Sequence, residues 1–111
     1  MTLVVALGLV LALAGCGGAG PEASEPVRTD RVDLPKSYRF EPAVIDVDAG
    51  TTVTWTNHDD FPHNVHLLDG SDETKSLPLG GSATLTFEEP GTIEYECSLH
   101  PQQMQGTVVV R

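Results

Sequence analysis

The chain has 111 residues, of which six are basic and sixteen acidic, and its formal net charge is −10 at neutral pH. This length leaves room for one small domain, and so few Lys and Arg side chains disfavour nucleic-acid binding, which depends on basic contacts to phosphates. We expect a docking partner with a basic or neutral face, unless the negative charge serves solubility alone.

An apolar stretch, TLVVALGLVLALAG, opens the chain. Its core has about a dozen apolar residues, whereas a membrane-spanning helix needs roughly 20. Small residues follow it, so we predict an export signal peptide over residues 1–15, although it has no Lys or Arg before the apolar core. The run LAGC resembles the bacterial lipobox, which implies lipidation of Cys16; a plain secretory signal and a buried helix are the alternatives.

Residues 16–37 are rich in Gly, Pro, Ser and charged side chains and have no apolar period. This composition predicts a flexible tether that starts at the lipidated Cys16. About 20 such residues reach on the order of 25 Å. We therefore expect a lipoprotein of the cell envelope, in the periplasm or on the outer face of the cytoplasmic membrane, held to the membrane by its lipid anchor.

From Tyr38 onward, short runs with a period of two alternate with turn residues such as Gly50, Gly70 and Gly91. Runs of this kind, rich in β-branched and aromatic residues, predict strands. The predicted strands cover residues 44–50, 51–57, 63–70, 82–91, 92–97 and 106–110. Because no helical period interrupts them, we predict one all-β domain over residues 38–111, a Greek-key β-sandwich or barrel of about seven to eight strands.

The alternation also predicts which side chains point inward, since neighbouring strand residues face opposite sides. His63 is in phase with Val65, and Cys97 is in phase with Tyr95. Both His63 and Cys97 are therefore expected on the inner face, and Trp55 is expected in the core.

The run YECSLHPQQM, residues 95–104, places a thiol, an imidazole and a thioether close together: Cys97, His100 and Met104. His63 would add a second inward imidazole. Two imidazoles and one thiolate with a weak axial thioether are typical of a blue-copper electron-transfer site. The other cysteine, Cys16, belongs to the lipobox, and a Cys16–Cys97 disulfide is the alternative.

The domain resembles the small cupredoxins of the plastocyanin and amicyanin type over its whole length. The matching stretches are VIDVDAGTTVTWTN, NHDDFPHNV, YECSLHP and MQGTVVV. The resemblance implies one type 1 copper ion with His63, Cys97 and His100 as equatorial ligands and Met104 as axial ligand. It also implies that the neighbourhood of Asn64 forms hydrogen bonds to the ligand loop and holds the cysteine.

One feature departs from this pattern. Three residues separate His100 from Met104, one more than in amicyanin-like loops and one fewer than in plastocyanin-like loops. Gln103 and Gln105 are therefore alternatives to Met104 as the axial ligand.

The resemblance implies electron transfer by copper that cycles between Cu(I) and Cu(II), without catalysis, because four ligands leave no open position for a substrate. Electrons would pass through an apolar surface around Leu99, His100 and Pro101 to redox protein partners. We expect a monomer and no enzyme activity.

Three other functions are alternatives to this one. A copper carrier or chaperone of the cell envelope is the alternative function, although the chain lacks the Met- or His-rich clusters typical of that class. A copper enzyme would need paired His-x-His motifs, which are absent. A metal-free structural module is the remaining alternative.

Overall fold

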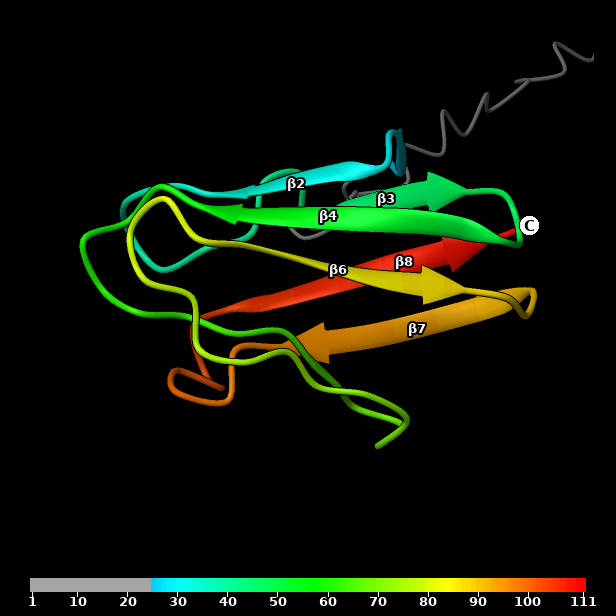
Figure 1. The fold of residues 1–111 in the computed structure, drawn as a ribbon. Coiled ribbons are helices and arrows are strands. Elements are labelled where there is room, and N and C mark those ends of the chain that lie inside the picture. The colour runs from blue at the N-terminus through cyan, green and yellow to red at the C-terminus, as the bar shows by residue number, and fades with distance from the viewer. Residues whose placement is uncertain (1–24) are drawn as a thin grey trace, which may run out of the picture.

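The computed structural model describes residues 25–111, which form two β-sheets and no helix (Figure 1). The strands are β1 (Val27–Arg28), β2 (Arg31–Leu34), β3 (Val44–Val47), β4 (Thr51–Asn57), β5 (His66–Leu67), β6 (Ser82–Phe87), β7 (Gly91–Glu96) and β8 (Gln105–Val110). One sheet has the order β1-β3-β8-β7-β5 and the other has the order β2-β4-β6. The predicted all-β class is confirmed. Within these residues there is accordingly no apolar helix of membrane-spanning length.

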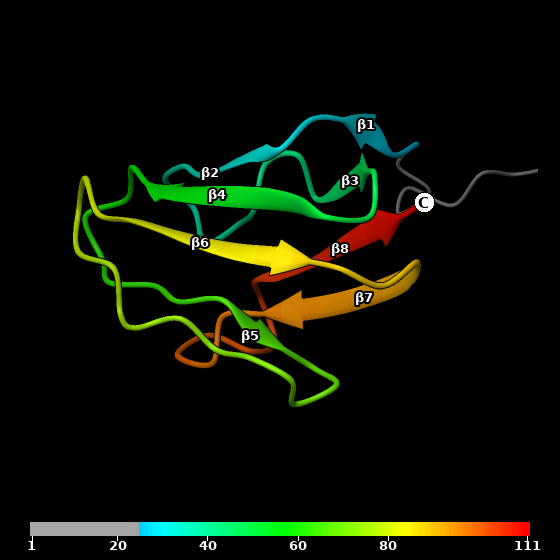
Figure 2. The same cartoon turned by 45° about the vertical axis from the view of Figure 1, so that its right-hand side comes forward.

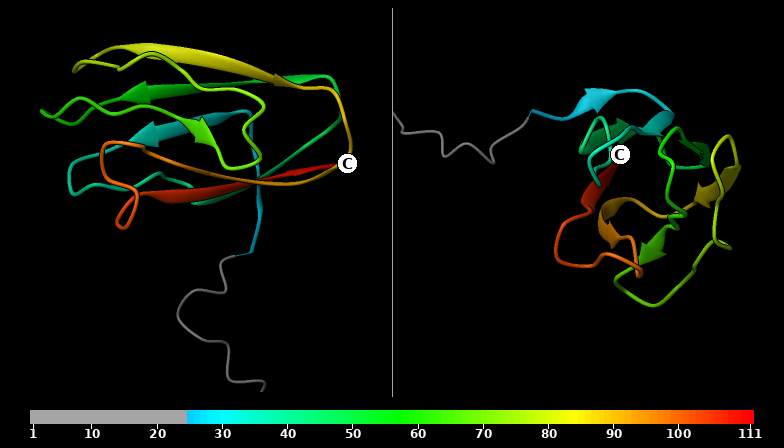
Figure 3. Two further views of the ribbon diagram at one scale, coloured as in Figure 1. Left: turned by 90° about the horizontal axis from the view of Figure 1, so that it is seen from below. Right: turned by 90° about the vertical axis from the view of Figure 1, so that its left-hand side faces the viewer.

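The two sheets face each other across a shared core. Strand β8 pairs in parallel with β3 and antiparallel with β7, while β4 pairs in parallel with β2 and antiparallel with β6. Seen end-on, the strands surround the core almost as a barrel (Figure 3). Strands β4 and β7 end at the same end of this barrel, where β8 begins (Figures 1 and 2). The loops at that end carry the predicted metal ligands.

The core is built around two large aromatic side chains, Trp55 and Tyr95, neither of which is exposed. Their rings meet edge to face, with centroids 5.4 Å apart, and Phe40 packs on Tyr95 in the same way at 4.7 Å. Gly106 lies directly against the Tyr95 ring, so that a Cβ at this position would overlap the ring. The sequence therefore needs glycine at the start of β8 to let β8 approach β7.

The ordered domain begins earlier than the sequence analysis predicts. Strands β1 and β2 lie within the segment 16–37 that we expected to be a flexible tether, and Val32 and Leu34 of β2 are buried. Strand β2 has only two apolar residues, Val32 and Leu34, and they alternate with charged ones. Its composition therefore resembles that of a charged tether. The signal peptide, Cys16 and the first part of the tether lie outside the described residues.

The segment 63–70 is also more irregular than predicted. Only His66 and Leu67 form a strand there, as β5. His63 instead exchanges two backbone hydrogen bonds with Leu77: its N–H donates to the Leu77 carbonyl at 3.2 Å, and the Leu77 N–H donates to the His63 carbonyl at 2.7 Å. This isolated bridge fixes the backbone of His63 outside the main sheets.

Candidate metal centre

Four side chains with metal-binding atoms come from two loops at the same end of the barrel. His63 follows β4, whereas Cys97, His100 and Met104 belong to the loop between β7 and β8. His63, Cys97 and Met104 are fully buried, and His100 is only partly buried. The structure thus brings the predicted ligands to one place and lets one of them reach the surface.

The separations between these groups suit a shared ion. The Cys97 Sγ lies 3.7 Å from the His63 Nδ1. A thiolate and an imidazole that bind one ion at about 2.3 and 2.05 Å in a trigonal arrangement are roughly 3.8 Å apart. The rings of His63 and His100 have centroids 5.2 Å apart, and two imidazoles on one ion have centres roughly 5 Å apart. Both pairs therefore fit.

His100 is less closely placed than His63 and Cys97. Within residues 25–111, no three His, Cys, Asp or Glu side chains converge as a cluster that could hold a metal ion. His63 and Cys97, with Nδ1 and Sγ 3.7 Å apart, are therefore the most closely placed pair of the centre.

The loop between β7 and β8 is closed by its own backbone. The Cys97 N–H donates to the Met104 carbonyl at 3.1 Å, and the His100 N–H donates to the Cys97 carbonyl at 3.0 Å. The Met104 N–H donates to the His100 carbonyl at 3.1 Å. These bonds return Met104 to the core beside Cys97, whereas Gln103 and Gln105 are exposed.

Asn64 links the two loops that carry the ligands. Its backbone N–H points to the Cys97 Sγ at 3.5 Å. Its side-chain oxygen accepts the Ser98 N–H at 2.8 Å, and its Nδ2 donates to the Ser98 Oγ at 2.8 Å and to a Glu73 carboxylate oxygen at 3.0 Å. Asn64 is therefore in a position to restrain the thiol and the residue after it.

Asp59 is a residue of this centre that the sequence analysis did not find. Its buried carboxylate accepts a hydrogen bond from the His63 Nε2 at 2.8 Å, and its other oxygen accepts the Asp60 N–H at 2.8 Å. The hydrogen bond from His63 holds the pKa of Asp59 below its usual range. This hydrogen bond orients the His63 ring so that Nδ1, the nitrogen that would bind a metal, faces the Cys97 Sγ. Asp59 lies in a run of polar loop residues, and nothing local marks it as buried.

An apolar surface surrounds the partly buried His100. Leu99 is 49% exposed, Pro101 is also exposed, and Phe61 is 52% exposed. Tyr38 lies beside His100 as well, with ring centroids 4.7 Å apart. Leu99 and Pro101 are expected on this surface from the sequence, whereas Phe61 and Tyr38 are not.

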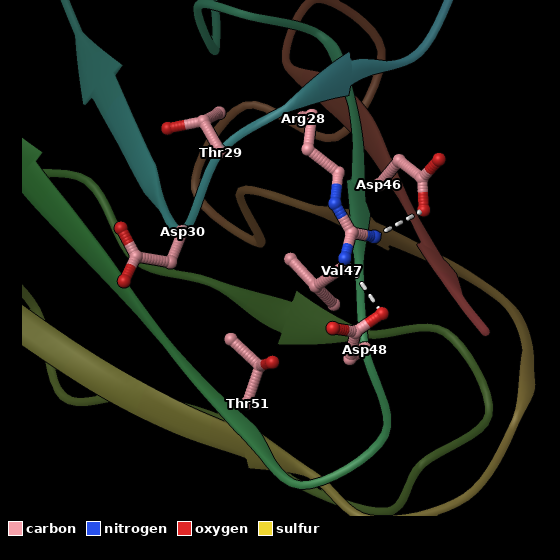
Figure 4. A pocket seen from close by; sticks show the side chains of 7 residues that line it. All are labelled: Arg28, Thr29, Asp30, Asp46, Val47, Asp48 and Thr51. Atoms are coloured by element: carbon pink, nitrogen blue, oxygen red, sulfur yellow. Dashed lines mark hydrogen bonds and ion pairs between the residues drawn. The ribbon is translucent and has the colours of Figure 1, made fainter.

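A separate pocket of about 310 Å³ involves the first strand, β1 (Figure 4). Its lining has no His or Cys and contains Arg28, which donates to Asp46 at 3.2 Å and to Asp48 at 2.6 Å. Arg111 also donates to Asp46, at 2.7 Å. Through Asp46, these ion pairs join both β1 and the C-terminal residue to β3. The pocket is therefore lined by structural ion pairs and is not a candidate metal centre.

Comparisons with known proteins agree with this picture. Residues 3–110 match the family model of the cupredoxin-like domain. Amicyanin-alpha from Methylorubrum extorquens is 32% identical over 99% of this chain and 97% of its own length. Amicyanin from Paracoccus denitrificans is 40% identical over 71% of this chain, which spans 63% of that relative.

Solved structures have the same fold. A purple cupredoxin from Nitrosopumilus maritimus superposes with a TM-score of 0.66 at 31% identity, over 73% of this chain and 98% of that one. An oxidised amicyanin variant superposes with a TM-score of 0.68 at 32% identity, over 80% of this chain and 95% of that one.

Proposed function

Because the chain belongs to the family of cupredoxin-like domains, we propose that it is an electron carrier with one type 1 copper ion. His63, Cys97, His100 and Met104 would hold the copper. Copper supplies the one-electron couple between Cu(I) and Cu(II). The observation that carries the proposal is the buried contact between the His63 Nδ1 and the Cys97 Sγ at 3.7 Å.

The protein's own side chains have three tasks in this function. Asp59 accepts a hydrogen bond from the His63 Nε2 and so orients the ring with Nδ1 toward the metal site. The Asn64 N–H lies 3.5 Å from the sulfur and stabilises negative charge on it. The burial of Cys97 and Met104 excludes water and substrates from the centre.

A rigid centre suits electron transfer because the ligand positions then change little between the two oxidation states. Backbone hydrogen bonds tie Cys97 to Met104, and Asn64 ties the loop of His63 to Ser98. His100, the only partly exposed ligand, would carry electrons to the apolar surface formed with Leu99 and Pro101. The partners on that surface would be a redox protein donor and acceptor.

The proposal extends to the place of the protein in the cell. The signal at residues 1–15 and lipidation of Cys16 would export the domain and anchor it to the membrane of the cell envelope. Radioactive lipid labelling of the wild-type chain and of a Cys16→Ser variant tests the anchor. Label that persists in the variant would contradict it.

The absorption and paramagnetic-resonance spectra of the copper-loaded protein test the central claim. A thiolate-to-copper charge-transfer band should give an intense visible colour, and Cys97→Ser should abolish that colour while the metal-free fold survives. A colourless Cu(II) complex of the wild-type protein would instead favour a copper carrier or chaperone. A band that persists in Cys97→Ser would assign the sulfur ligand elsewhere.

A further inference from the structure

The loop between β2 and β3 has an uncommon backbone. Ser37 has a φ of 90° and Tyr38 a φ of 54°, and they are the only non-glycine residues with positive φ among those described. Non-glycine residues rarely have a positive φ, and those that do tend to lie at functional sites. Here the two residues turn the chain so that the Tyr38 ring lies against the candidate metal centre.

Tyr38 contacts both histidines of that centre. Its ring meets the His100 ring edge to face, with centroids 4.7 Å apart and planes inclined by 68°. It meets the His63 ring at 5.7 Å and 81°. These separations are typical of attractive aromatic pairs. His100 therefore has an aromatic contact with Tyr38 in addition to its contact with His63.

Tyr38 is itself held in place. Phe61 stacks on its ring at 5.6 Å with an interplanar angle of 25°, and Tyr38 also packs against the hydrophobic core. The Tyr38 ring is thus supported from the side of the loop that precedes His63.

His100, by contrast, has little else to hold its ring. It lies in an exposed turn in which Leu99 and Pro101 face solvent. Among the hydrogen bonds formed within residues 25–111, none involves the His100 imidazole, whereas the His63 imidazole is held by Asp59. The aromatic contacts are therefore the main restraint on the orientation of His100.

We propose that Tyr38 is a positioning residue for electron transfer, whose ring confines the His100 imidazole beside His63 in both oxidation states. This inference rests on the proposed function, because it assigns Tyr38 a task in the copper centre. By limiting the movement of His100 between Cu(II) and Cu(I), the ring lowers the reorganisation that opposes electron exchange. Its hydroxyl has no part in this role.

Two variants test the role: Tyr38→Leu, which removes the ring, and Tyr38→Phe, which keeps it. In the Cu(I)-loaded full chain, Tyr38→Leu should increase the fraction of His100 that leaves the centre by about two- to tenfold, the range that corresponds to the loss of one aromatic pair. NMR relaxation dispersion of the His100 ring protons measures this exchange. Tyr38→Met repeats the experiment if the leucine variant does not fold.

The reduction potential gives a readout that a purely structural role would not move. Cu(I) tolerates the loss of a ligand better than Cu(II), so Tyr38→Leu should raise the potential and slow electron self-exchange, whereas Tyr38→Phe should restore both. Wild-type behaviour of Tyr38→Leu in exchange and potential would overturn the inference. So would a phenylalanine variant that behaves like the leucine variant, since it would assign the effect to the hydroxyl.

The metal-free protein separates this inference from the proposed function. Loss of the Tyr38 ring current should shift the His100 ring-proton resonances in Tyr38→Leu and not in Tyr38→Phe, and unchanged resonances in Tyr38→Leu would overturn the contact itself. If the wild-type protein is blue and Tyr38→Leu has the same exchange and reduction potential, the role of Tyr38 is overturned and the proposed function is not. A colourless wild-type protein would overturn the proposed function and, with it, that role.

Discussion

Replacement of Asp59 by alanine should destabilise the metal-free domain markedly, although Asp59 lies in a polar loop. The side chain accepts two hydrogen bonds, one from the buried His63 Nε2 and one from the Asp60 N–H, both at 2.8 Å. A hydrogen bond to a charged group contributes about 1.5–3 kcal/mol when buried, and an ordinary one contributes about 1 kcal/mol. Because both bonds end on the same carboxylate, Asp59→Ala should lower the free energy of unfolding by at least about 3 kcal/mol.

Asp59→Asn separates the charge from the hydrogen bond. The amide oxygen can still accept one of the two bonds, and a charge-assisted bond is roughly twice as strong as a neutral one. We expect Asp59→Asn to cost about 1–2 kcal/mol at neutral pH. In the copper-loaded protein it should also raise the reduction potential, because a buried negative charge favours Cu(II) over Cu(I).

Urea unfolding of the metal-free proteins at neutral pH measures these differences, provided that the dependence on urea is unchanged. Asp60→Ala is a matched control: the Asp60 carboxylate is exposed, and the one ion pair that it forms with another of residues 25–111, to Lys36 at 3.5 Å, lies at the surface. It should change the free energy of unfolding by less than about 0.5 kcal/mol. An Asp59→Ala variant as stable as this control would refute the argument.

Three further changes test other parts of the structure. Gly106→Ala should lower the free energy of unfolding by about 1–3 kcal/mol, because its Cβ must displace the buried Tyr95 ring, and thermal unfolding measures the loss. The pKa of Asp46 is lowered by its hydrogen bond from Arg111, so this contribution is present above about pH 4 and is lost as the pH falls through the lowered value. Urea midpoints should accordingly fall less in acid for Asp46→Asn than for the wild type; equal slopes would contradict this. Met104→Leu should keep the blue colour and raise the reduction potential, and voltammetry that finds an unchanged potential would exclude Met104 as the axial ligand.

The sequence predicts the fold wherever alternation is regular. Strand β4 shows this best, since Val53 and Trp55 are buried as its period of two requires. Strand β2 was missed because it is short and its two buried residues alternate with charged ones, which resembles the composition of a tether. Four residues are too few to establish a period of two when half of them are charged.

The candidate centre likewise contains residues that the sequence predicts and residues that it does not. Cys97, His100 and Met104 lie close together in the sequence, so their local spacing marks them as a set. Asp59 and Tyr38 have no such signal, because their relation to the histidines arises from how distant loops fold over each other. A buried carboxylate and an aromatic contact of this kind become visible only in three dimensions.

The ion pairs around Arg28 fix where the domain is joined to whatever precedes it. Strand β1 and the C-terminus lie at the end of the barrel away from the loop between β7 and β8, and β8, with six residues, spans about 20 Å between the two ends (Figure 2). A support attached through the N-terminus, whether a lipid layer or an electrode, would therefore lie at the end of the domain opposite the candidate metal centre. The histidine edge would be turned outward, toward soluble partners and away from the support.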